Sequence, residues 1–493
     1  MNLLILITLP LLTAFAVLLS PKPQHARVFS LAGATLQLLI AVLLFLQYRA
    51  SVSNGPWAFE SMYDWYPSWH IGLHLGVDGI SVAMILLTAF VVVAGVLVSW
   101  NVEKMPKEFH FLLILLSLGA YGFFISLDLF TLFFFLELAV IPKYLLIGVW
   151  GSGKKEYSAN KLALMLMAGS ALVLIGILAL YYAQPAGAGS FDLTLIGKNN
   201  IPESTQKVIF PLLFVGFGIF TALFPFHTWV PDGHSSAPTA GSMFLAGISM
   251  KLGGYGCLRV ATYLLPLGAT YYSNTIIVLA AIAILYGAFA TMMQNDLKYI
   301  NAYSSVSHCG FVLLGIGMLT KTAITGAVFQ MVSHGLMTAL FFAVIGMVYE
   351  RTHTRLVAQM GGLMKVLPFI TTIMFIAGLC SLGLPGLSGF VAEMTVFMGS
   401  WEKVETIYRV ITIAAGMSIV VTAVYILRAV GQTAMGPLAH EEYKGYRDAS
   451  WNEKLAAIIL VLGILAIGLA PFWLNDLVTP STELIMKKIL SSK

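Results

Sequence analysis

The sequence predicts an all-α polytopic membrane protein with about 14 transmembrane helices. Three observations predict this fold class: a mean hydropathy of +0.88, a hydrophobic content of 59% and a charged content of only 10% over 493 residues. A soluble chain of this length could not bury so much apolar surface. The sequence also contains no dinucleotide-binding fingerprint and no phosphate-binding loop, so it indicates no soluble nucleotide-binding domain.

The apolar runs give the positions of the helices, because a helix needs about 20 mostly apolar residues to cross a bilayer. In chain order the predicted spans are 2–20, 28–48, 76–100, 109–127, 130–150, 160–183, 208–226, 238–264, 274–294, 300–319, 324–349, 367–400, 407–430 and 454–475. The first run resembles a secretory signal, but it lacks a basic start and a small-residue cleavage site. We therefore expect it to remain as a membrane helix.

The distribution of basic residues predicts the orientation of the chain. If the N-terminus faces outward, fifteen of the 27 lysines and arginines fall in cytoplasmic loops and nine on the outer side. Loops rich in lysine and arginine normally stay in the cytoplasm. We therefore expect both termini on the outer (periplasmic) side of a bacterial cytoplasmic (inner) membrane. The net charge of +5 reflects this asymmetry and predicts no nucleic-acid partner.

The longer connections between spans are aromatic or polar. Residues 49–75 are rich in Trp and Tyr, which favours a segment at the level of the lipid headgroups, either as a cap over the helix ends or as a binding surface. Residues 184–206 form a turn-rich connection, and residues 436–451 form a polar cytoplasmic loop. The three cysteines lie far apart in different spans, and their spacing predicts neither a disulfide framework nor a metal site.

Two of the predicted spans are interrupted by helix-breaking residues. Span 208–226 is interrupted near Phe224-Pro225-Phe226, and span 367–400 is interrupted by the glycines and the proline of residues 383–389. In transporters built from inverted repeats, such paired breaks expose backbone polar groups to a cavity near the midplane and mark the ion path. The alternative is that Pro and Gly only kink two tolerated helices.

Six ionisable side chains fall inside the predicted spans, and a seventh, Arg259, lies nearer a span end. A charged group at the bilayer centre costs roughly 2.5–3.5 kcal/mol on insertion scales, so such groups usually serve a function. The alternative for each is a group that only pairs two helices. The glycines that follow the lysine of span 238–264 are expected to let a neighbouring helix approach closely. The six are Glu137, Lys143, Lys251, His308, His334 and Glu393.

These residue types suit a proton relay. Desolvation favours the neutral form of a buried lysine and a nearby carboxylate favours the charged form, so making or breaking a Glu–Lys pair switches the lysine between holding and releasing a proton. A histidine can pass the proton on near neutral pH. His308 and His334 lie at mid-depth in consecutive spans, although either one alone could be a helix-to-helix hydrogen bond.

Glu137 and Lys143 share one predicted span. Six residues on an ideal helix correspond to about 120° of rotation and roughly 9 Å of rise, so the two side chains cannot pair as neighbours on one face. Pro142 could bend the helix and change that relation. The alternative for Lys143 is a side chain that snorkels toward the cytoplasmic headgroups, because the span ends near Trp150.

Five blocks in this chain together carry a resemblance to a known family. They are DLFTLFFFLE at 128–137, HTWVPDGHSSAPTAGSMFLAGISMKLGGYG at 227–256, AYSSVSHCGFVLLGI at 302–316, MVSHGL at 331–336 and GLPGLSGFVAEM at 383–394. In order and spacing they resemble the antiporter-like chain M of proton-pumping NADH:quinone oxidoreductase, respiratory complex I. The likeness extends over nearly the whole chain.

The resemblance implies a fold of fourteen transmembrane helices with two inverted five-helix repeats, each containing a broken helix. It divides the chain into four parts. These are the N-terminal helices 1–3 with the interfacial loop at 1–108, a first repeat of helices 4–8 at 109–264, a second repeat of helices 9–13 at 265–430, and a cytoplasmic loop, helix 14 and C-terminal tail at 431–493.

The resemblance also implies roles for the buried residues. Glu137 would be the carboxylate of the fifth helix, Lys251 the central lysine of the eighth, and Glu393 the acidic residue of the twelfth that faces the next subunit. His308 and His334 would lie between Lys251 and Glu393. Residues Trp229 to His234 match the loop after the broken seventh helix.

One departure from the family affects the Glu137 region. The family usually has a lysine in the seventh helix five residues before the proline of the break, whereas this sequence has Phe220 there. Lys143 is a second departure, because the family more often has a neutral residue at that position. We expect Lys143 to supply the missing charge from the helix that carries Glu137. The alternative is an altered module that contributes structure or only some of the proton steps.

By resemblance, the chain is a proton-translocating subunit of the complex I enzyme (a translocase), with no redox centre of its own. FMN, iron–sulfur clusters and quinone would belong to partner chains, and the antiporter-like chains L and N would lie on either flank. The alternatives are a subunit of a multi-chain cation/proton antiporter or membrane-bound hydrogenase, or a non-pumping structural subunit of complex I.

Overall fold

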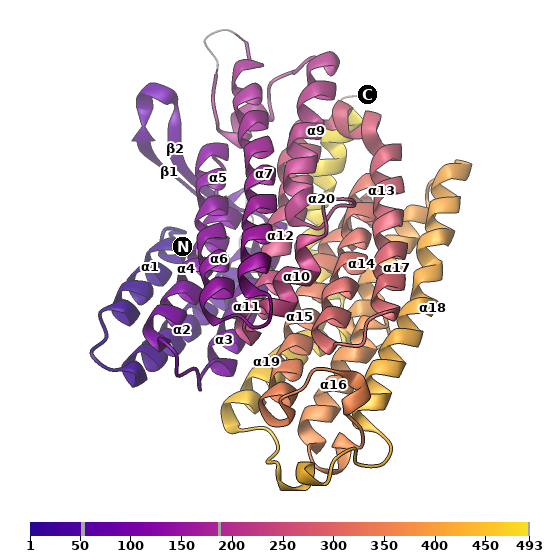
Figure 1. The fold of residues 1–493 in the computed structure, drawn as a ribbon. Helices are drawn as coiled ribbons and strands as arrows, with labels where there is room; N and C mark the ends of the chain where they lie inside the picture. The colour runs from indigo at the N-terminus through magenta and orange to yellow at the C-terminus, as the bar shows by residue number, and fades with distance from the viewer. Residues whose placement is uncertain (51–54, 186–188, 492–493) are drawn as a thin grey trace.

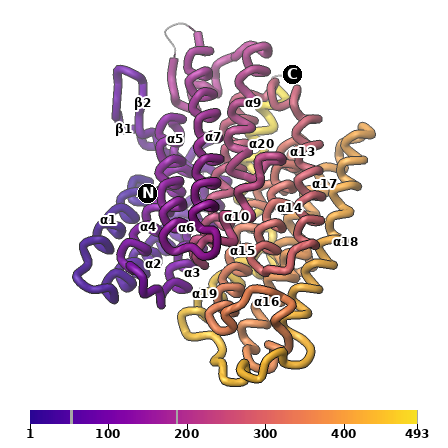
Figure 2. The backbone as a smooth tube through the Cα atoms, viewed as in Figure 1, coloured from indigo at the N-terminus to yellow at the C-terminus, as the bar shows by residue number. Residues whose placement is uncertain are grey.

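The computed structural model of the chain describes residues 1–50, 55–185 and 189–491. Most of these residues are helical, and the long helices run alongside one another in one bundle (Figure 1). A two-stranded hairpin and the C-terminal end lie at one end of the bundle, and the loop before the last two helices lies at the other (Figure 2). Many Leu, Ile, Val and Met side chains are exposed on the outer helices, as expected for helices that face lipid.

The N-terminal part contains three helices and the hairpin. Its elements are α1 (Ile5–Leu18), α2 (Pro23–Ala50), β1 (Ala58–Tyr66), a 3₁₀ turn (Pro67–Trp69), β2 (Ile71–Val77) and α3 (Gly79–Val98). Asp78 caps α3, because its carboxylate accepts a hydrogen bond from the Ser81 amide at 2.9 Å. In α3, 94% of the most apolar stretch is buried, so this helix belongs to the centre of the bundle.

The middle part is built from long helices and several short ones. They are α4 (Pro106–Ile125), α5 (Leu129–Leu138), α6 (Val140–Trp150), α7 (Lys155–Tyr182), α8 (Leu193–Ile196), α9 (Glu203–Phe220), α10 (Trp229–Ser236), α11 (Thr239–Phe244), a π-helical turn (Leu245–Ser249), α12 (Met250–Gly256) and a second π-helical turn (Cys257–Thr262). Predicted span 238–264 is therefore one helical path with two π-helical turns. Residues 186–188, inside the predicted turn-rich connection, lie outside the described residues.

The C-terminal part contains the central helix of the bundle, α15. The helices are α13 (Pro266–Met292), α14 (Leu297–Gly317), α15 (Lys321–Thr352), α16 (Pro368–Ser381), α17 (Ser388–Trp401), α18 (Thr406–Ala434), α19 (Trp451–Leu469) and α20 (Phe472–Ser491), with 3₁₀ turns at Val357–Gln359, Leu363–Lys365 and Glu441–Gly445. The most apolar stretch of α15 is completely buried. It packs against α14, α17, α16, α19 and α3.

The helical, membrane-spanning class predicted from the sequence agrees with the structure. Nine helices in the described part of the chain are long and apolar enough to cross a bilayer, with α5 and α6 counted as one path. The helices α1 and α16 are apolar but shorter. Span 367–400 is divided into α16 and α17 at the predicted break, and span 208–226 ends as a helix at Phe220, before the predicted break at Phe224.

The all-α prediction is wrong for residues 58–77, which form the antiparallel hairpin β1–β2. The sequence predicts only an interfacial segment there. At the tip of the hairpin, the side chains of Trp65, Tyr66 and Trp69 are more than half exposed, whereas Trp57 at its base is buried against the guanidinium of Arg259, 4.7 Å from its ring centroid. The base of the hairpin thus caps the helix ends, and its tip leaves an aromatic surface open.

A group of titratable side chains ties the hairpin to the bundle. His74 Nδ1 lies 2.6 Å from Asp192 Oδ2, and Glu60 Oε1 lies 3.6 Å from the other ring nitrogen. Burial lowers the pKa of His74, but the hydrogen bond to Asp192 and the negative charges of Asp192, Glu60 and Asp128 together outweigh it, so the net pKa is raised. Burial acts in the opposite direction on Asp192 and would raise its pKa, but the hydrogen bonds from His74 and Thr194 hold the pKa below its usual value.

These shifts give the hairpin contact a pH range. Because the pKa of His74 is raised in the fold, its contribution to stability is complete below about pH 6.5 and is lost as the pH rises through the folded value. The lowered pKa of Asp192 acts in the opposite sense, and its contribution is lost only in strong acid. Burial raises the pKa of Asp128 to about 6, so its carboxylate also weakens the fold at higher pH. Because the Asp128 contribution is lost between about pH 4 and 6 and that of His74 above about pH 6.5, the contact is strongest near pH 4 and weakens as the pH rises.

Two features recur in the two halves of the chain. Asp128 before α5 and Asp296 before α14 both cap their helices with φ −96° and ψ 126°, and each forms an isolated β-bridge to the loop that follows the next long helix. Helices α9 and α16 are both followed by a left-handed residue, Ala222 (φ 69°) and Gly383 (φ 75°), and the amide after it donates to a carbonyl in the last turn of the same helix. The broken helices therefore have the same local geometry.

The segment after the last predicted span is not the tail expected from the sequence, because it forms the 20-residue helix α20. This helix packs against α3 and α15. Ser481 Oγ accepts a hydrogen bond from the amide of Gly79 at 3.0 Å, and Thr482 lies 3.0 Å from Thr325 between their hydroxyl oxygens. One face of α20 is apolar and buried and the other is polar, so the hydropathy averaged over consecutive residues is too low to predict a membrane helix here.

Candidate functional site

Lys251 lies in the middle of the bundle, two residues after the end of a π-helical turn. Its side chain is 1% exposed. Its ammonium group donates one hydrogen bond to the carbonyl oxygen of Ala246, within the turn at Leu245–Ser249, and lies 2.8 Å from Nδ1 of His334. Turns of π-helix are rare and are frequent at functional sites. This turn directs a backbone carbonyl at the lysine and so helps to hold its charge in an apolar surrounding.

Four predicted residues form a continuous buried chain across four helices. Lys251 on α12 contacts His334 on α15, and the ring of His334 stacks on that of His308 on α14 with a centroid separation of 5.3 Å. His308 Nδ1 then lies 3.3 Å from Oε1 of Glu393 on α17. Each of these four side chains is at most 6% exposed. The structure therefore brings together four of the six residues selected from the sequence.

Polar neighbours orient the two histidines. His308 Nε2 lies 3.0 Å from the hydroxyl of Ser381, and Gln330 Nε2 lies 3.3 Å from His308 Nδ1. His334 Nδ1 also lies 3.8 Å from the thiol of Cys309. Its Nε2 is buried and has no hydrogen-bond partner among the described residues. One nitrogen of the central histidine is thus open to a water molecule or to a new partner after rotation of the ring.

The broken helix α16–α17 positions Glu393. The chain turns at Gly383, where a Cβ atom would lie 2.8 Å from Oε2 of Glu393, so a glycine is needed both for the left-handed φ and for the close approach. At the start of α17, Ser388 accepts a hydrogen bond from Ser333 of α15 at 2.8 Å. The break therefore places backbone groups beside a buried carboxylate.

The other two predicted residues form a separate group around Phe220. Glu137 on α5 accepts a hydrogen bond from Ser170 of α7. Lys143 on α6 is 1% exposed, and its Nζ lies 5.6 Å from the centroid of the Phe220 ring. That nitrogen has no hydrogen-bond partner among the residues described, although the carboxylate of Glu137 acts on it electrostatically.

The geometry around Lys143 distinguishes between a lysine that points into the bundle and one that snorkels to the headgroups. The helix is interrupted at Ala139, between α5 and α6, because Pro142 has no amide hydrogen to give to the carbonyl of Leu138. Glu137 and Lys143 form no direct ion pair, as their spacing predicted. The buried nitrogen contradicts the alternative in which Lys143 snorkels to the headgroups.

Two buried residues close to Lys251 were not selected from the sequence. His234 on α10 is completely buried and stacks on Phe342, and neither of its ring nitrogens has a hydrogen-bond partner within the described chain. Lys298 at the start of α14 was counted as a cytoplasmic loop residue, but it is 5% exposed and donates to the carbonyl of Ala237 at 2.7 Å. The charges of Lys251 and Lys298 both act on His234.

A polar cavity of about 540 Å³ opens beside α10 and the start of α14, the helices that carry His234 and Lys298. Its lining includes Ser235 and Ser236, which follow His234 on α10, and Asp232, which pairs with Lys161 at 2.7 Å. The family motif at 227–256 marks this region in the sequence, but it does not indicate that His234 is completely buried.

Arg259 forms a third buried charge, in the second π-helical turn. It pairs with Asp78 and lies against the rings of Trp57 and Tyr255. The Tyr255 hydroxyl lies 2.9 Å from Ser81 Oγ. Both partners of the ion pair are at most 1% exposed, so this pair holds α3, α12 and the hairpin together.

Close contacts at glycines bring the helices together beside Lys251, as the sequence predicted. A Cβ atom on Gly253 would lie 2.5 Å from the carbonyl oxygen of Phe217 on α9, and one on Gly256 would lie 2.2 Å from the Phe217 ring. The structure also has no group of three or more His, Cys, Asp or Glu side chains that could hold a metal ion among its described residues.

Comparison with known proteins gives consistent results for the whole chain. Residues 126–419 match the family described as NADH:quinone oxidoreductase/Mrp antiporter, TM. The chain is 37% identical over 475 residues to NAD(P)H-quinone oxidoreductase chain 4 1 of Synechococcus sp. (strain JA-3-3Ab), covering 94% of this chain and 89% of that relative. It is 35% identical over 494 residues to NADH-quinone oxidoreductase subunit M of Rickettsia bellii (strain RML369-C), covering 98% of each.

A solved structure has the same fold. Superposition on a chain of the respiratory complex I from Thermus thermophilus with bound NADH gives a TM-score of 0.90 at 26% identity, with 99% of both chains covered. The likeness therefore includes the broken helices and the regions that hold the buried chain of ionisable residues.

Proposed function

The chain belongs to the NADH:quinone oxidoreductase/Mrp antiporter transmembrane family, and from that membership and its buried polar chain we propose that it is a proton-translocating subunit of NADH:quinone oxidoreductase. The observation that carries the proposal is the unbroken series of contacts from Lys251 through His334 and His308 to Glu393. Redox chemistry in other subunits supplies the energy. This chain contributes the path of the protons.

The geometry suits stepwise transfer along the chain. Lys251 can give a proton to Nδ1 of His334 through their direct contact, and His308 can pass one to Glu393. Stacked rings do not point their nitrogens at each other, so the step between the histidines needs a water molecule or rotation of a ring. The unpartnered Nε2 of His334 is available for that step.

Protons would reach Lys251 by way of the buried residues His234 and Lys298. The polar cavity is lined by Asp232 and by Ser235 and Ser236, which follow His234 on α10. The charges of Lys298 and Lys251 act on His234. A buried histidine without hydrogen-bond partners is costly unless water or a proton reaches it. We assign His234 and Lys298 to the input side of the path, and Glu393 to its far end.

The Glu137 group would act as the switch of the module. We assign to Lys143 the charge that the family usually carries on the seventh helix, where this chain has Phe220. The observations in favour are the burial of Lys143, its contact with the Phe220 ring and the electrostatic action of Glu137 on it. Because Lys143 makes no fixed bond, its ammonium group is free to move toward or away from the carboxylate.

The architecture and surroundings proposed for this chain follow from its family. We assign it fourteen crossings and two inverted five-helix repeats at 109–264 and 265–430, which the matched caps of α5 and α14 and the matched breaks after α9 and α16 support. Both termini lie on the periplasmic side of a bacterial cytoplasmic membrane. Chains L and N flank it, one of them at Glu393, and FMN, iron–sulfur clusters and quinone belong to partner subunits.

A non-pumping structural role is the second candidate, and the phenylalanine at position 220 is the observation that favours it. A subunit of a cation/proton antiporter or of a membrane-bound hydrogenase would use the same fold. Soluble iron–sulfur and flavin chains that co-purify with this one would identify the oxidoreductase, and their absence would favour the antiporter.

The test of the proposal is redox-driven proton pumping in membrane vesicles that carry Lys251→Ala, with NADH:quinone electron transfer followed in the same preparation. We expect an assembled complex that pumps fewer protons per NADH oxidised. The control is Lys207→Ala, which removes a lysine paired with Glu203 at the start of α9, and it should pump normally. Unchanged pumping in Lys251→Ala would leave this chain as a scaffold.

A further inference from the structure

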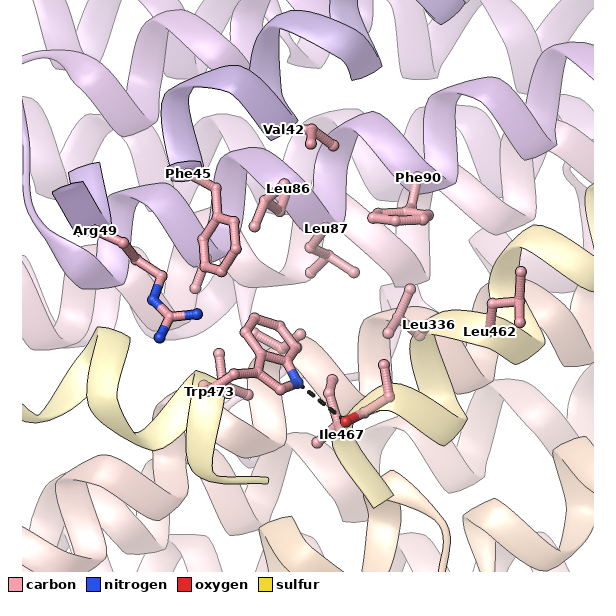
Figure 3. Close-up of a pocket in the computed structure, with 15 residues that line it drawn as sticks. Val42, Phe45, Arg49, Leu86, Leu87, Phe90, Leu336, Leu462, Ile467 and Trp473 are labelled. Atoms are coloured by element: carbon pink, nitrogen blue, oxygen red, sulfur yellow. Dashed lines mark hydrogen bonds between the residues drawn. The ribbon is translucent and has the colours of Figure 1, made fainter. Parts of the chain in front are cut away.

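An apolar groove lies on the outside of the bundle, on the far side of α15 from the polar chain. It has a volume of about 480 Å³ and is lined by side chains of α2, α3, α15, α19 and α20. Figure 3 shows Phe90, Leu87 and Leu336 along its floor, and Val42 and Leu462 on its walls. Both wall residues are exposed on the surface of the bundle, so the groove is open to the lipid.

One end of the groove is polar, and its chemistry differs from that of the floor. Arg49, at the C-terminal end of α2, and Trp473, at the start of α20, lie together there (Figure 3). The guanidinium of Arg49 rests 5.7 Å from the centroid of the Phe45 ring, and no described carboxylate lies within ion-pair distance of it. The Trp473 indole donates to the carbonyl of Ala466 at 3.0 Å.

We propose that this groove is a specific phospholipid site, with one acyl chain lying along the floor and the lipid phosphate bound by Arg49. A guanidinium is the side chain that best matches the oxygens of a phosphate group, and a tryptophan with an apolar body and a polar tip is typical of the headgroup level. The unpaired charge and the apolar groove that leads away from it are therefore complementary to a lipid in both parts.

The dimensions of the groove favour an acyl chain over a helix from another protein. A helix is about 10 Å across and rises about 5.4 Å per turn, so 480 Å³ would hold roughly one turn. An acyl chain is long and thin and can follow a groove from Arg49 to Phe90. Since lipid tails are as apolar as the groove, close packing and the phosphate contact must provide the selectivity.

The site lies one layer behind the proton path. Leu87 on the groove floor packs against Gly335, where a Cβ atom would lie 2.7 Å from the leucine side chain, and Gly335 follows His334 in the sequence. The carbonyl oxygen of Gly247, in the π-helical turn before Lys251, lies 2.9 Å from the same Cβ position. The bound lipid would thus support the helix turns that hold Lys251 and His334 in contact.

The test is to count the phospholipids retained by the purified complex after extensive washing in detergent, using mass spectrometry. Arg49→Gln removes the phosphate partner, and Ala466→Phe fills the groove beside Trp473. We expect each variant to retain one phospholipid fewer per complex than the parent. Arg409→Gln is the matched control, because Arg409 is also stacked on an aromatic ring but lies on α18, away from the groove. It should retain the full number.

A second measurement identifies the location of the lipid. The complex is reconstituted with phospholipids whose acyl chains carry bromine, which quenches tryptophan fluorescence. The fluorescence of Trp473 is the difference between the parent and Trp473→Phe, and its quenching is found by comparing that difference in brominated and ordinary lipid. We expect Trp473 to be quenched in the parent and protected in Ala466→Phe. Three outcomes would each overturn the proposal. The parent and the variants could retain equal numbers of phospholipids, or an isoprenoid quinone could be recovered in place of a phospholipid. Bromine could also fail to quench Trp473 because another subunit covers it.

Discussion

Replacement of Lys143 by methionine isolates the role of its charge. Methionine has nearly the length and volume of lysine, and volume-conserving exchanges in a packed interior usually cost less than about 1.5 kcal/mol. Lys143 is 1% exposed and makes no hydrogen bond to any described residue. Packing is therefore almost unchanged in Lys143→Met, and the difference between the two proteins is the ammonium group beside Glu137 and Phe220.

The size of the effect follows from the burial of Lys143, whose charge interacts with the half-buried carboxylate of Glu137. Two unit charges about 6–8 Å apart in a medium of effective dielectric constant about 20 interact by about 2–3 kcal/mol. Since about 1.4 kcal/mol corresponds to a tenfold change in an equilibrium, this coupling shifts proton occupancy by about 30- to 150-fold. Solvent does not screen a lysine that is 1% exposed. Loss of this coupling is large enough to stop the switch of the Glu137 group.

The assay is the number of protons pumped per NADH oxidised in vesicles, together with the thermal stability of the purified complex. We expect Lys143→Met to lower pumping without lowering stability, because an unpaired buried ammonium group contributes nothing to the fold. The double variant Lys143→Met/Phe220→Lys returns a lysine to the same space from α9 and should restore pumping. Lys154→Met, at the exposed start of α7, is the control.

Two results would contradict this reasoning. Full pumping in an assembled Lys143→Met complex would remove Lys143 from the proton path. A loss of pumping that accompanies a loss of stability, and that the lysine at position 220 does not repair, would show that Lys143 is a structural residue and does not replace the charge at Phe220.

Three further predictions concern the framework around the path. Asp78→Asn keeps an acceptor for the cap of α3 but leaves the buried guanidinium of Arg259 unpaired, so the unfolding free energy should fall by about 3–5 kcal/mol, measured by thermal unfolding of the complex. Amide protection of the hairpin should weaken as the pH rises above about 6.5, and in His74→Gln it should be lower and nearly independent of pH above that value, as measured by hydrogen exchange. Gly253→Ala places a methyl group against the backbone of α9 and should reduce the amount of subunit in the complex, whereas Gly254→Ala, which meets a flexible methionine side chain, should not.

The residues of the buried chain could be selected from the sequence because charge is rare in apolar runs. Lys251, His308, His334 and Glu393 stand out for that reason alone, and the structure brings them into one series of contacts. The order of those contacts depends on how four helices pack. It came to the sequence analysis only through the resemblance to a family.

Residues at helix ends were harder to interpret from sequence. Lys298 lies just before a predicted span, where hydropathy does not distinguish a loop residue from one that points into the bundle. Only packing decides this, and here the lysine reaches the carbonyl of Ala237 across a break between helices. His234 was part of a recognised motif, but nothing in the motif indicates which of its side chains is buried. The π-helical turns have no sequence signal at all.

Both ends of the buried chain lie beside backbone that is released from regular helix. At one end, the carbonyl of Ala246 within a π-helical turn accepts from Lys251, and at the other, the break at Gly383 lies against Glu393. A charge in a membrane needs polar partners, yet a fixed side-chain ion pair would hold the proton in one place. Backbone dipoles stabilise the charge without taking or giving a proton. The irregular backbone therefore lets Lys251 and Glu393 be charged in one step and neutral in the next, and a regular helix at either position would remove that freedom.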